Sequence, residues 1–464
     1  MAEPLHCRTI SRITIPAEAE EPEKFLLNAL DHAMVEGLAE VVYLYRHTLD
    51  PSRLQQSLRK ALRDFPMLCG RLRAGTGGAL SIDDTHQGIP FTVCECNVTL
   101  AAVSSGLHEA YAVYDFIDKI NPLLLARTNP PLFTVRLTRL DGGGCALGIS
   151  CAHAVADGYS FYSFIRHWSR AHEGMPAAAP WHERNAISFD DASAAAPRQP
   201  LPKTCNGFRC LSSLELLRLA VNFLTRRNSM VCRVLRFTRP QLAAIKNAAG
   251  RQGAVSLNDA LSAHLWQVCT KLQNAAGQTA SRKLLFGAGM RSKIDHPLAG
   301  HYFGNALSNV DVTCSIEELR HSHISVIAGK CRRKVAALDR DYLKTQMLWL
   351  RAREKNKQML RVFADVNPYA GDCVISSLFK LPVYEACFDG NKPCWAGVPA
   401  VTIPWVMYLL PSPAESGGIE VYANLPRSAA EKSKRDEWQA ELYKYGEAGD
   451  SSTRSEPGDE QEYV

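Results

Sequence analysis

The stretch that most constrains the fold runs from residue 132 to residue 158. Residues 132–140 alternate apolar and polar side chains, the turn Asp141-Gly142-Gly143-Gly144 follows, and an apolar run of small and branched residues continues to Ala152. This pattern predicts two strands joined by a tight turn. One face of the second strand carries its larger side chains and the other carries small ones, so another group can approach it closely.

A histidine, His153, directly follows this strand, with Asp157 four residues later and Gly158 next to it. Only small side chains flank His153, which leaves open space for a general base that must meet two substrates. A buried carboxylate needs a partner, so we expect Asp157 to hold a cation and to fix the loop. Taken alone, so short a pattern favours a structural histidine, and its context must decide.

Length and composition exclude several classes of protein. The 464 residues suggest two to three domains, and 46% of them are hydrophobic, as in ordinary soluble proteins. No apolar run reaches the roughly 18 residues that span a bilayer, and the N-terminus shows no secretory pattern. The fifteen cysteines lack metal-ligand spacing, Cys94-Glu-Cys96 being the nearest approach. We therefore predict a cytoplasmic protein with reduced thiols and no metal.

The charge distribution points to an anionic small ligand. The net charge is +6, of which the last nineteen residues contribute −5, so the rest of the chain carries +11. Such a surplus suits an anionic ligand or nucleic acid. Because no basic run is interleaved with aromatic residues, we do not expect nucleic acid.

Alternating helix and strand patterns recur in both halves and predict an α/β fold with mixed sheets. We expect an N-terminal lobe over 1–175, a linker or crossover segment over 176–228, a C-terminal lobe over 229–445 and an acidic disordered tail over 446–464. The segment Leu211–Leu224 is strongly apolar. We prefer a helix packed between the halves to one lying on a membrane, since its polar face is sparse.

Several motifs fall in one order and together resemble a known family. They are His153-Ala-Val-Ala-Asp157-Gly158, Ser256-Leu-Asn-Asp-Ala-Leu-Ser-Ala-His-Leu-Trp266, Arg291 and Tyr302-Phe-Gly-Asn305. The chain resembles the BAHD family of acyl-CoA-dependent acyltransferases, nearest to the shikimate/quinate hydroxycinnamoyl transferases. The resemblance extends from about Arg8 to Pro426. It implies a monomer with two similar lobes, between which a channel admits acyl-CoA from one face and the acceptor from the other, and it implies no permanently bound cofactor.

One family motif is altered. Members usually carry Asp-Phe-Gly-Trp-Gly before a basic residue and proline, whereas this chain has Cys387-Phe388-Asp389-Gly390-Asn391 before Lys392-Pro393. In the family this loop supports the lobe interface and the CoA side of the channel. Because this loop is not itself catalytic in the family, we expect the altered sequence to affect the affinity for the acyl donor and the choice of substrate, and not the acyl-transfer chemistry.

The resemblance places His153 midway along the channel as the general base. Acyl transfer from a thioester to a hydroxyl needs such a base, and an imidazole suits this role near pH 7. The tetrahedral oxyanion needs donors, for which Ser376, Ser377, Thr402 and Trp405 are candidates. Cys151 is a conceivable nucleophile, although its place among the apolar strand residues favours a buried core thiol.

Further site residues are assigned by their match to family positions. Asp157 is expected to pair with Arg291. Lys380 matches the place of an arginine that grips an acceptor carboxylate, although a surface lysine would fit equally well. Tyr43, Ser376 and Trp405 are taken as substrate-binding, and Ser256 and Lys293 as facing CoA. For the basic run 330–334 we prefer a solvated helix face to a phosphate site.

Two other classes of function remain open. A condensation-type enzyme of peptide synthesis also uses His-x-x-x-Asp-Gly, but it normally has a second histidine where this chain has Ala152, and it works with carrier domains. A catalytically idle binding protein on the same fold would fit the altered loop at Cys387.

Overall fold

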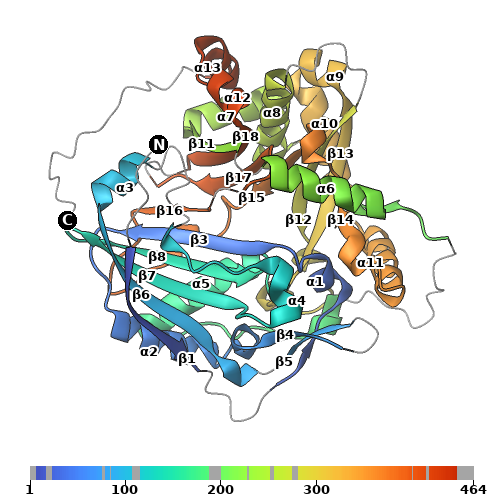
Figure 1. Cartoon of the computed structure of the whole chain (residues 1–464). Coiled ribbons are helices and arrows are strands. Elements are labelled where there is room, and N and C mark those ends of the chain that lie inside the picture. The colour runs from blue at the N-terminus through green and yellow to red at the C-terminus, as the bar shows by residue number, and fades with distance from the viewer. Residues whose placement is uncertain are drawn as a thin grey trace.

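Two six-stranded mixed sheets form the framework of the molecule (Figure 1). The computed structural model describes residues 7–16, 23–75, 79–83, 85–106, 115–187, 200–226, 229–250, 255–273, 281–399, 401–413 and 417–446. The first sheet has the order β1 (Cys7–Ile15), β6 (Ile89–Thr99), β7 (Phe133–Asp141), β8 (Cys145–Ala152), β3 (Leu38–Tyr45), β16 (Trp395–Gly397). The second has the order β11 (Met230–Phe237), β18 (Ile419–Pro426), β17 (Val406–Pro411), β15 (Cys373–Ser377), β12 (Ser281–Gly289), β13 (Leu307–Ser315).

The strand pair predicted around residues 132–152 is present. Strands β7 and β8 are antiparallel, and all three glycines of the turn adopt positive φ angles. These angles explain the choice of glycine, since other residues strain in this region. Every residue of β8 is buried, because the sheet pairs it on both edges and helices cover it.

Two long helices cover the first sheet. Helix α2 (Pro51–Leu62) begins at Asp50, whose carboxylate accepts hydrogen bonds from the first turn, and it buries the stripe Leu54, Leu58 and Leu62. Helix α5 (Gly158–His172) packs beside it and buries Phe161, Phe164, Ile165 and Trp168. Smaller elements of this half are β2 (Phe25–Leu26), α1 (Ala29–Ala33), β4 (Arg71–Ala74), β5 (Leu80–Asp83), α3 (Leu100–Gly106) and α4 (Leu125–Thr128).

The second sheet has its own core and its own helices. Helix α8 (Leu257–Leu272) is buried along almost its whole length, and it packs against α7 (Arg239–Ala249) and α10 (Ile324–Ala336). The remaining helices of this half are α9 (Ile316–His321), α11 (Arg340–Lys355), α12 (Arg427–Lys432) and α13 (Asp436–Leu442). The predicted α/β architecture of two similar lobes therefore matches the structure.

The C-terminal half also contributes to the N-terminal lobe. Strand β16 pairs antiparallel with β3 at the edge of the first sheet, and Val383, Phe388 and Trp395 belong to the first core. The expected division, with 229–445 as one lobe, therefore misses a crossover of the chain. A three-residue strand gives too short a pattern to be recognised in the sequence.

The segment predicted as a linker contains regular structure. Strands β9 (Thr204–Cys205) and β10 (Phe208–Cys210) form a small sheet with β14 (Val362–Ala364). Helix α6 (Ser213–Arg226) follows, and none of its residues is buried. The expectation that this helix packs between the two halves is therefore wrong. Residues 188–199 and the acidic tail after Gly446 lie outside the described residues.

Among the helices that the structure describes, none is long and apolar enough to cross a membrane. Within the same described residues, no group of three or more His, Cys, Asp or Glu side chains could hold a metal ion. All fifteen cysteines are free thiols.

A buried histidine predicts acid sensitivity of the C-terminal lobe. His264 of α8 is 0% exposed, and its Nε2 donates a hydrogen bond of 2.6 Å to the carbonyl oxygen of Leu442 in α13. Burial lowers the pKa of His264 from 6.5 to about 4. Its contribution to stability is therefore complete above pH 6.5 and is lost as the pH falls through 4, by about 3 kcal/mol in all.

This prediction is checked by urea unfolding at pH 7 and near pH 4. The variant His264→Gln removes the titrating group, so its loss of stability between the two pH values should be about 3 kcal/mol smaller than that of the wild type. Equal losses in both proteins would show that His264 is not responsible.

Candidate active site

His153 lies where β8 ends, at the side of the first sheet that meets the C-terminal half. The ladder holds its backbone, because the His153 amide donates to the carbonyl oxygen of Gly37 at 2.9 Å. The imidazole is half-buried, whereas Ala152, Ala154 and the next residues are fully buried. A Cβ atom on Gly37 would stand 3.1 Å from that of His153, so only glycine leaves the ring undisturbed. The ring therefore reaches solvent while its backbone is fixed.

Asn305 determines which nitrogen of His153 is free. The Asn305 Nδ2 atom donates to the carbonyl oxygen of His153 at 2.8 Å and to Asp31 Oδ1 at 2.8 Å. Because the amide nitrogen faces these two acceptors, the amide oxygen must face the imidazole, and Oδ1 lies 3.0 Å from Nδ1. Nδ1 therefore carries the proton, and Nε2 presents a lone pair. This is the tautomer that a general base requires.

A buried ion pair holds Asn305 in turn. Asp31 is 0% exposed, and its Oδ1 accepts from Arg184 Nη1 at 3.0 Å. Arg184 also donates to the carbonyl oxygen of Val155 at 2.9 Å, two residues beyond His153. The chain of contacts runs from Arg184 through Asp31 and Asn305 to His153, so three distant segments fix one ring.

The Asp157 carboxylate joins the two halves of the chain. Its Oδ2 and Oδ1 accept from Arg291 Nη1 and Nη2 at 2.8 and 2.9 Å, as the resemblance implied. The same carboxylate accepts from the amides of Ser160 and Ala306, both at 2.9 Å. Burial alone would raise the pKa of Asp157, but Arg291 and these amides hold it below its usual value. The carboxylate is therefore ionised, and its role is to fix the loop.

Asn305 is expected to act by positioning His153. Asn305→Ala removes the acceptor of the Nδ1 proton, so we predict a fall in kcat of about ten to a hundredfold with little change in KM for the donor. Asn309→Ala is the matched control, because Asn309 is also buried but makes no hydrogen bond to His153 in this structure. Steady-state kinetics on both variants check this, and equal effects would refute a specific role for Asn305.

Two of the candidate oxyanion donors lie at the end of β15. Ser376 and Ser377 are partly buried there, and the following Leu378 and Leu381 lie within van der Waals distance of a Cβ placed on Gly158. Lys380 is exposed in the same turn. This turn therefore meets the start of α5, and its residues are retained as candidates for the site. Thr402 is partly buried in the loop before β17.

Tyr43 and Trp405 are not accessible to a substrate in this structure. Tyr43 is 0% exposed within the first core, where burial raises its pKa well above the usual value. Trp405 belongs to the second core and precedes β17, at the end of that strand away from Leu409, which pairs with Ser377. Both rings are packed in the cores, so the prediction that Tyr43 and Trp405 contact the substrate does not fit this structure.

The residues predicted to face CoA, Ser256 and Lys293, lie on different elements of the C-terminal half. Ser256 caps α8, since its Oγ accepts from the Asp259 amide at 3.2 Å and its own amide donates to Asp259 Oδ2 at 2.8 Å. Lys293 is exposed, two residues beyond Arg291. In the basic run 330–334, Lys330 binds Glu318 at 2.6 Å and Arg332 lies 3.5 Å from Asp259. The other basic residues of the run are exposed, as a solvated helix face requires.

The altered loop at residues 387–391 anchors the C-terminal half to the first lobe. Phe388 is fully buried, with its ring centroid 4.7 Å from that of Trp168 and 5.3 Å from that of His172. Asp389 Oδ1 lies 3.0 Å from His172 Nε2 and also binds Arg53, and its Oδ2 accepts from the Asp50 amide. The loop is thus well bonded to α2 and α5 despite its changed sequence.

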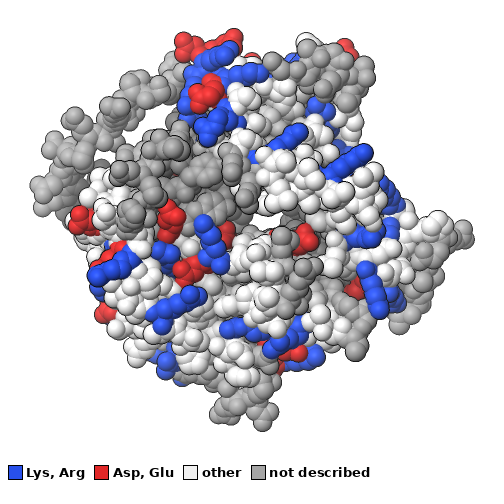
Figure 2. All heavy atoms as spheres, viewed as in Figure 1, with Lys and Arg blue, Asp and Glu red and all other residues white. Residues whose placement is uncertain are grey.

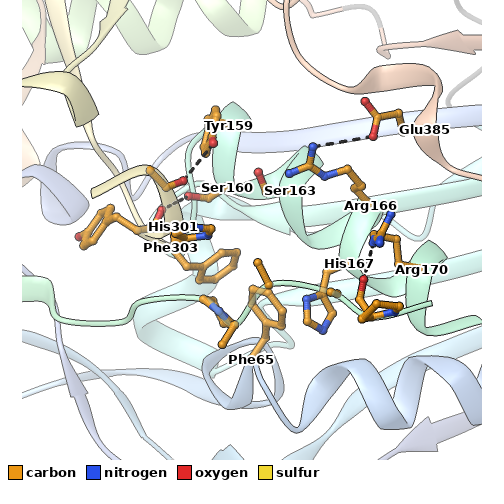
Figure 3. Close-up of a pocket in the computed structure, with 17 residues that line it drawn as sticks. Phe65, Tyr159, Ser160, Ser163, Arg166, His167, Arg170, His301, Phe303 and Glu385 are labelled. Carbon is orange, nitrogen blue, oxygen red and sulfur yellow. Dashed lines mark hydrogen bonds and ion pairs between the residues drawn. The ribbon is translucent and has the colours of Figure 1, made fainter. Parts of the chain in front are cut away.

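A cavity of about 370 Å³ lies beside α5, and His153 is not among its lining residues (Figure 3). Tyr159, Ser163, Arg166 and Arg170 line one side of it, and Arg166 extends to Glu385 at 3.8 Å. A smaller cavity of about 130 Å³ is lined by Gly37, which contacts His153, and by Glu36, whose pKa burial raises. His153 therefore lies next to the smaller cavity and outside the larger one.

Cys151 is excluded as an exposed nucleophile. Its side chain is 1% exposed in the first core, and burial raises the pKa of its thiol well above the usual value. A thiol needs access and an ionised form to attack a thioester. The expectation of a core cysteine is therefore confirmed.

Comparison with known proteins identifies the family. The Transferase family matches residues 5–439. Rosmarinate synthase of Plectranthus scutellarioides is 27% identical over 410 residues, covering 84% of this chain and 89% of that protein. Shikimate O-hydroxycinnamoyltransferase of Nicotiana tabacum is 24% identical over 423 residues, covering 88% and 93%. TRI101 of F. graminearum, solved with coenzyme A and deoxynivalenol, has a TM-score of 0.70 at 16% identity, covering 90% and 98%.

The chain therefore belongs to the Transferase family, the BAHD acyl-CoA-dependent acyltransferases, as its motifs indicated. The likeness to TRI101 confirms the fold. His153, Asp157 and Arg291 are predicted by the sequence motifs. No motif indicates the contacts of Asp31 and Arg184, and Asn305 is marked only by the motif Tyr302-Phe-Gly-Asn305.

Proposed function

We propose that this protein transfers an acyl group from acyl-CoA to a hydroxyl or amine of a small molecule, with His153 as the general base. The observation that carries the proposal is the contact of His153 Nδ1 with Asn305 Oδ1 at 3.0 Å, which leaves Nε2 free at a half-buried site. Membership of the family and a structural relative crystallised with coenzyme A support the same reaction. Acyl-CoA is a co-substrate here, and the surplus of positive charge suits its phosphates.

The reaction needs no covalent enzyme intermediate. His153 Nε2 takes the proton of the acceptor as its oxygen or nitrogen attacks the thioester carbon, and a tetrahedral oxyanion forms. Collapse of this intermediate breaks the carbon–sulfur bond. The imidazolium then returns its proton to the departing CoA thiolate, so the free enzyme is restored. The burial of Cys151 supports direct transfer over a thioester on the enzyme.

For the oxyanion we propose the hydroxyl of Ser376 or Ser377 as donor. Both residues are partly buried at the end of β15, next to the turn that meets the start of α5. A hydroxyl donates one hydrogen bond and can rotate toward the charge as it develops. Trp405 no longer competes for this role because it is packed in the second core.

Lys380 is proposed to bind a carboxylate on the acceptor. It is exposed in the turn beside Gly158, and two similar proteins act on hydroxycinnamoyl or shikimate compounds according to their names. We predict that Lys380→Ala lowers kcat/KM about tenfold for carboxylated acceptors and leaves neutral ones nearly unchanged. A panel of matched acceptors checks this, with Lys392→Ala as the control. Equal losses on both kinds of acceptor would refute it.

The reaction itself is tested by thiol release. Purified protein is incubated with CoA thioesters from acetyl through aromatic to long-chain, together with mixed alcohols and amines, and free CoA is measured. We expect release that depends on both substrates and disappears in His153→Ala. Equal inactivity of wild type and His153→Ala on every pair would favour an idle binding protein. Activity only with carrier-bound acyl groups would favour a condensation-type enzyme. Light scattering on the same samples tests the expected monomer.

A further inference from the structure

Helix α6 presents an apolar face to the solvent. Leu214, Leu217, Val221 and Leu224 recur at spacings of three and four residues, so they share one face of the helix. Their exposed fractions are 56, 60, 50 and 62%. Helices on the surface of soluble proteins normally turn such a face inward, and a contiguous exposed apolar patch marks an interaction site.

A second segment extends this apolar face. Leu360, in the loop after α11, is 70% exposed. The neighbouring Arg361 accepts a backbone hydrogen bond from Leu211 at 2.7 Å and donates from Nη2 to Ser213 Oγ at 3.2 Å. Leu360 therefore stands near the start of α6. We call Leu214, Leu217, Val221, Leu224 and Leu360 together the α6 patch.

The charges around the α6 patch are positive. Arg218, four residues beyond Leu214 and therefore next to it on the helix surface, and Arg361 at the start of α6 are exposed. The one acid of α6, Glu215, lies on the other side of the helix, where it binds Lys203 at 2.9 Å and also Arg209. Figure 2 shows the uncharged surface over α6 bordered by basic side chains. An apolar stripe bordered by arginines is typical of a helix that lies in the surface of an anionic membrane.

We propose that α6 docks this enzyme on the surface of a membrane that contains anionic phospholipid. The apolar side chains would enter the boundary between headgroups and acyl chains, and the arginines would meet the phosphates. A second copy of the chain fits less well, because Arg218 and Arg361 beside the patch would meet the same basic residues of the other copy, with no acid of α6 on this side to pair with them. The site at His153 is separate from this surface, so the inference does not depend on the proposed reaction.

Vesicle flotation with the full chain tests the proposal. Vesicles of phosphatidylcholine alone are compared with vesicles of equal parts phosphatidylcholine and phosphatidylserine. We expect binding to the second kind, weakened by high salt. The double variant Leu217→Gln, Leu224→Gln should lower the partition coefficient about tenfold or more, and Arg218→Glu should lower it selectively on the anionic vesicles.

Val326→Gln is the matched control, because Val326 is 45% exposed on α10 outside the α6 patch. It should bind vesicles like the wild type. Circular dichroism and thiol release without vesicles should be the same for all variants, since the changed side chains are exposed. Absence of binding to anionic vesicles, or equal binding by the double variant, would overturn the proposal. A dimer in light scattering that the double variant dissociates, without an effect on vesicles, would overturn it in favour of a second copy.

Discussion

His153→Ala should lower kcat by about a thousandfold while the melting temperature stays within a few degrees of the wild type. General bases contribute on the order of 10² to 10⁴ in rate, and the ring of His153 is half-buried with one side-chain hydrogen bond to Asn305. Its removal therefore affects chemistry far more than stability. Steady-state thiol release and thermal unfolding measure the two effects on the same samples.

The matched control is His301→Ala. His301 is exposed and lines the larger cavity beside α5, so its variant asks whether that cavity is the reaction site. We expect kcat to remain within about twofold of the wild type, as for a surface residue that takes no part in the chemistry. A large loss in His301→Ala together with retained activity in His153→Ala would move the active site to the larger cavity.

Asp157→Asn should lower the free energy of unfolding by about 3 to 5 kcal/mol. The substitution leaves the Arg291 guanidinium without its buried counterion, at a side chain that is 11% exposed. Asparagine still caps α5, so the loss reports the ion pair and not the cap. Since the pKa of Asp157 is held below its usual value, the contribution is present above about pH 4 and is lost as the pH falls further.

Glu95→Gln is the control for the loss of a charge at a surface pair. Glu95 binds Arg8 at 3.2 Å, with side chains 44 and 78% exposed, so its removal should change stability by less than about 1 kcal/mol. Urea unfolding measures both variants at pH 7. If Asp157→Asn folded with unchanged stability and instead switched acceptor preference, the structural role given to Asp157 would be incorrect.

Several elements of the fold could be predicted from local sequence patterns. The hairpin of β7 and β8 could be predicted because its glycines and its alternation are local signals. The crossover of β16 could not be predicted, since a three-residue strand has no period and its partner β3 lies some 350 residues earlier in the chain.

The candidate site shows the same limit. His153 and Asp157 share one short motif, and the resemblance to the family predicted the ion pair between Arg291 and Asp157. By contrast, Arg184 lies in the segment expected to be a linker and Asp31 lies in a short helix, so no spacing joined them to Asn305. Tyr43 was assigned by its position in a family segment, but that position does not tell whether a ring points to solvent or core.

The position of helix α6 differs from the one predicted by its sequence. Its apolar residues and sparse polar face favoured burial between the halves, which is the usual fate of such a helix. The structure leaves the apolar face outside, because Leu216 and Leu219 make the partly buried contacts while Leu217 and Leu224 face away. Hydrophobic content alone could not tell which of the two faces the protein covers.

The position of the thioester relative to His153 is the most direct measure of the mechanism. A crystal structure with CoA bound should place the CoA sulfur within about 4 Å of His153 Nε2, because the base must reach both the attacking acceptor and the departing thiolate. The Nδ1 contact with Asn305 should be unchanged in that complex. A sulfur atom seated in the larger cavity beside α5, out of reach of the imidazole, would contradict the role given to His153.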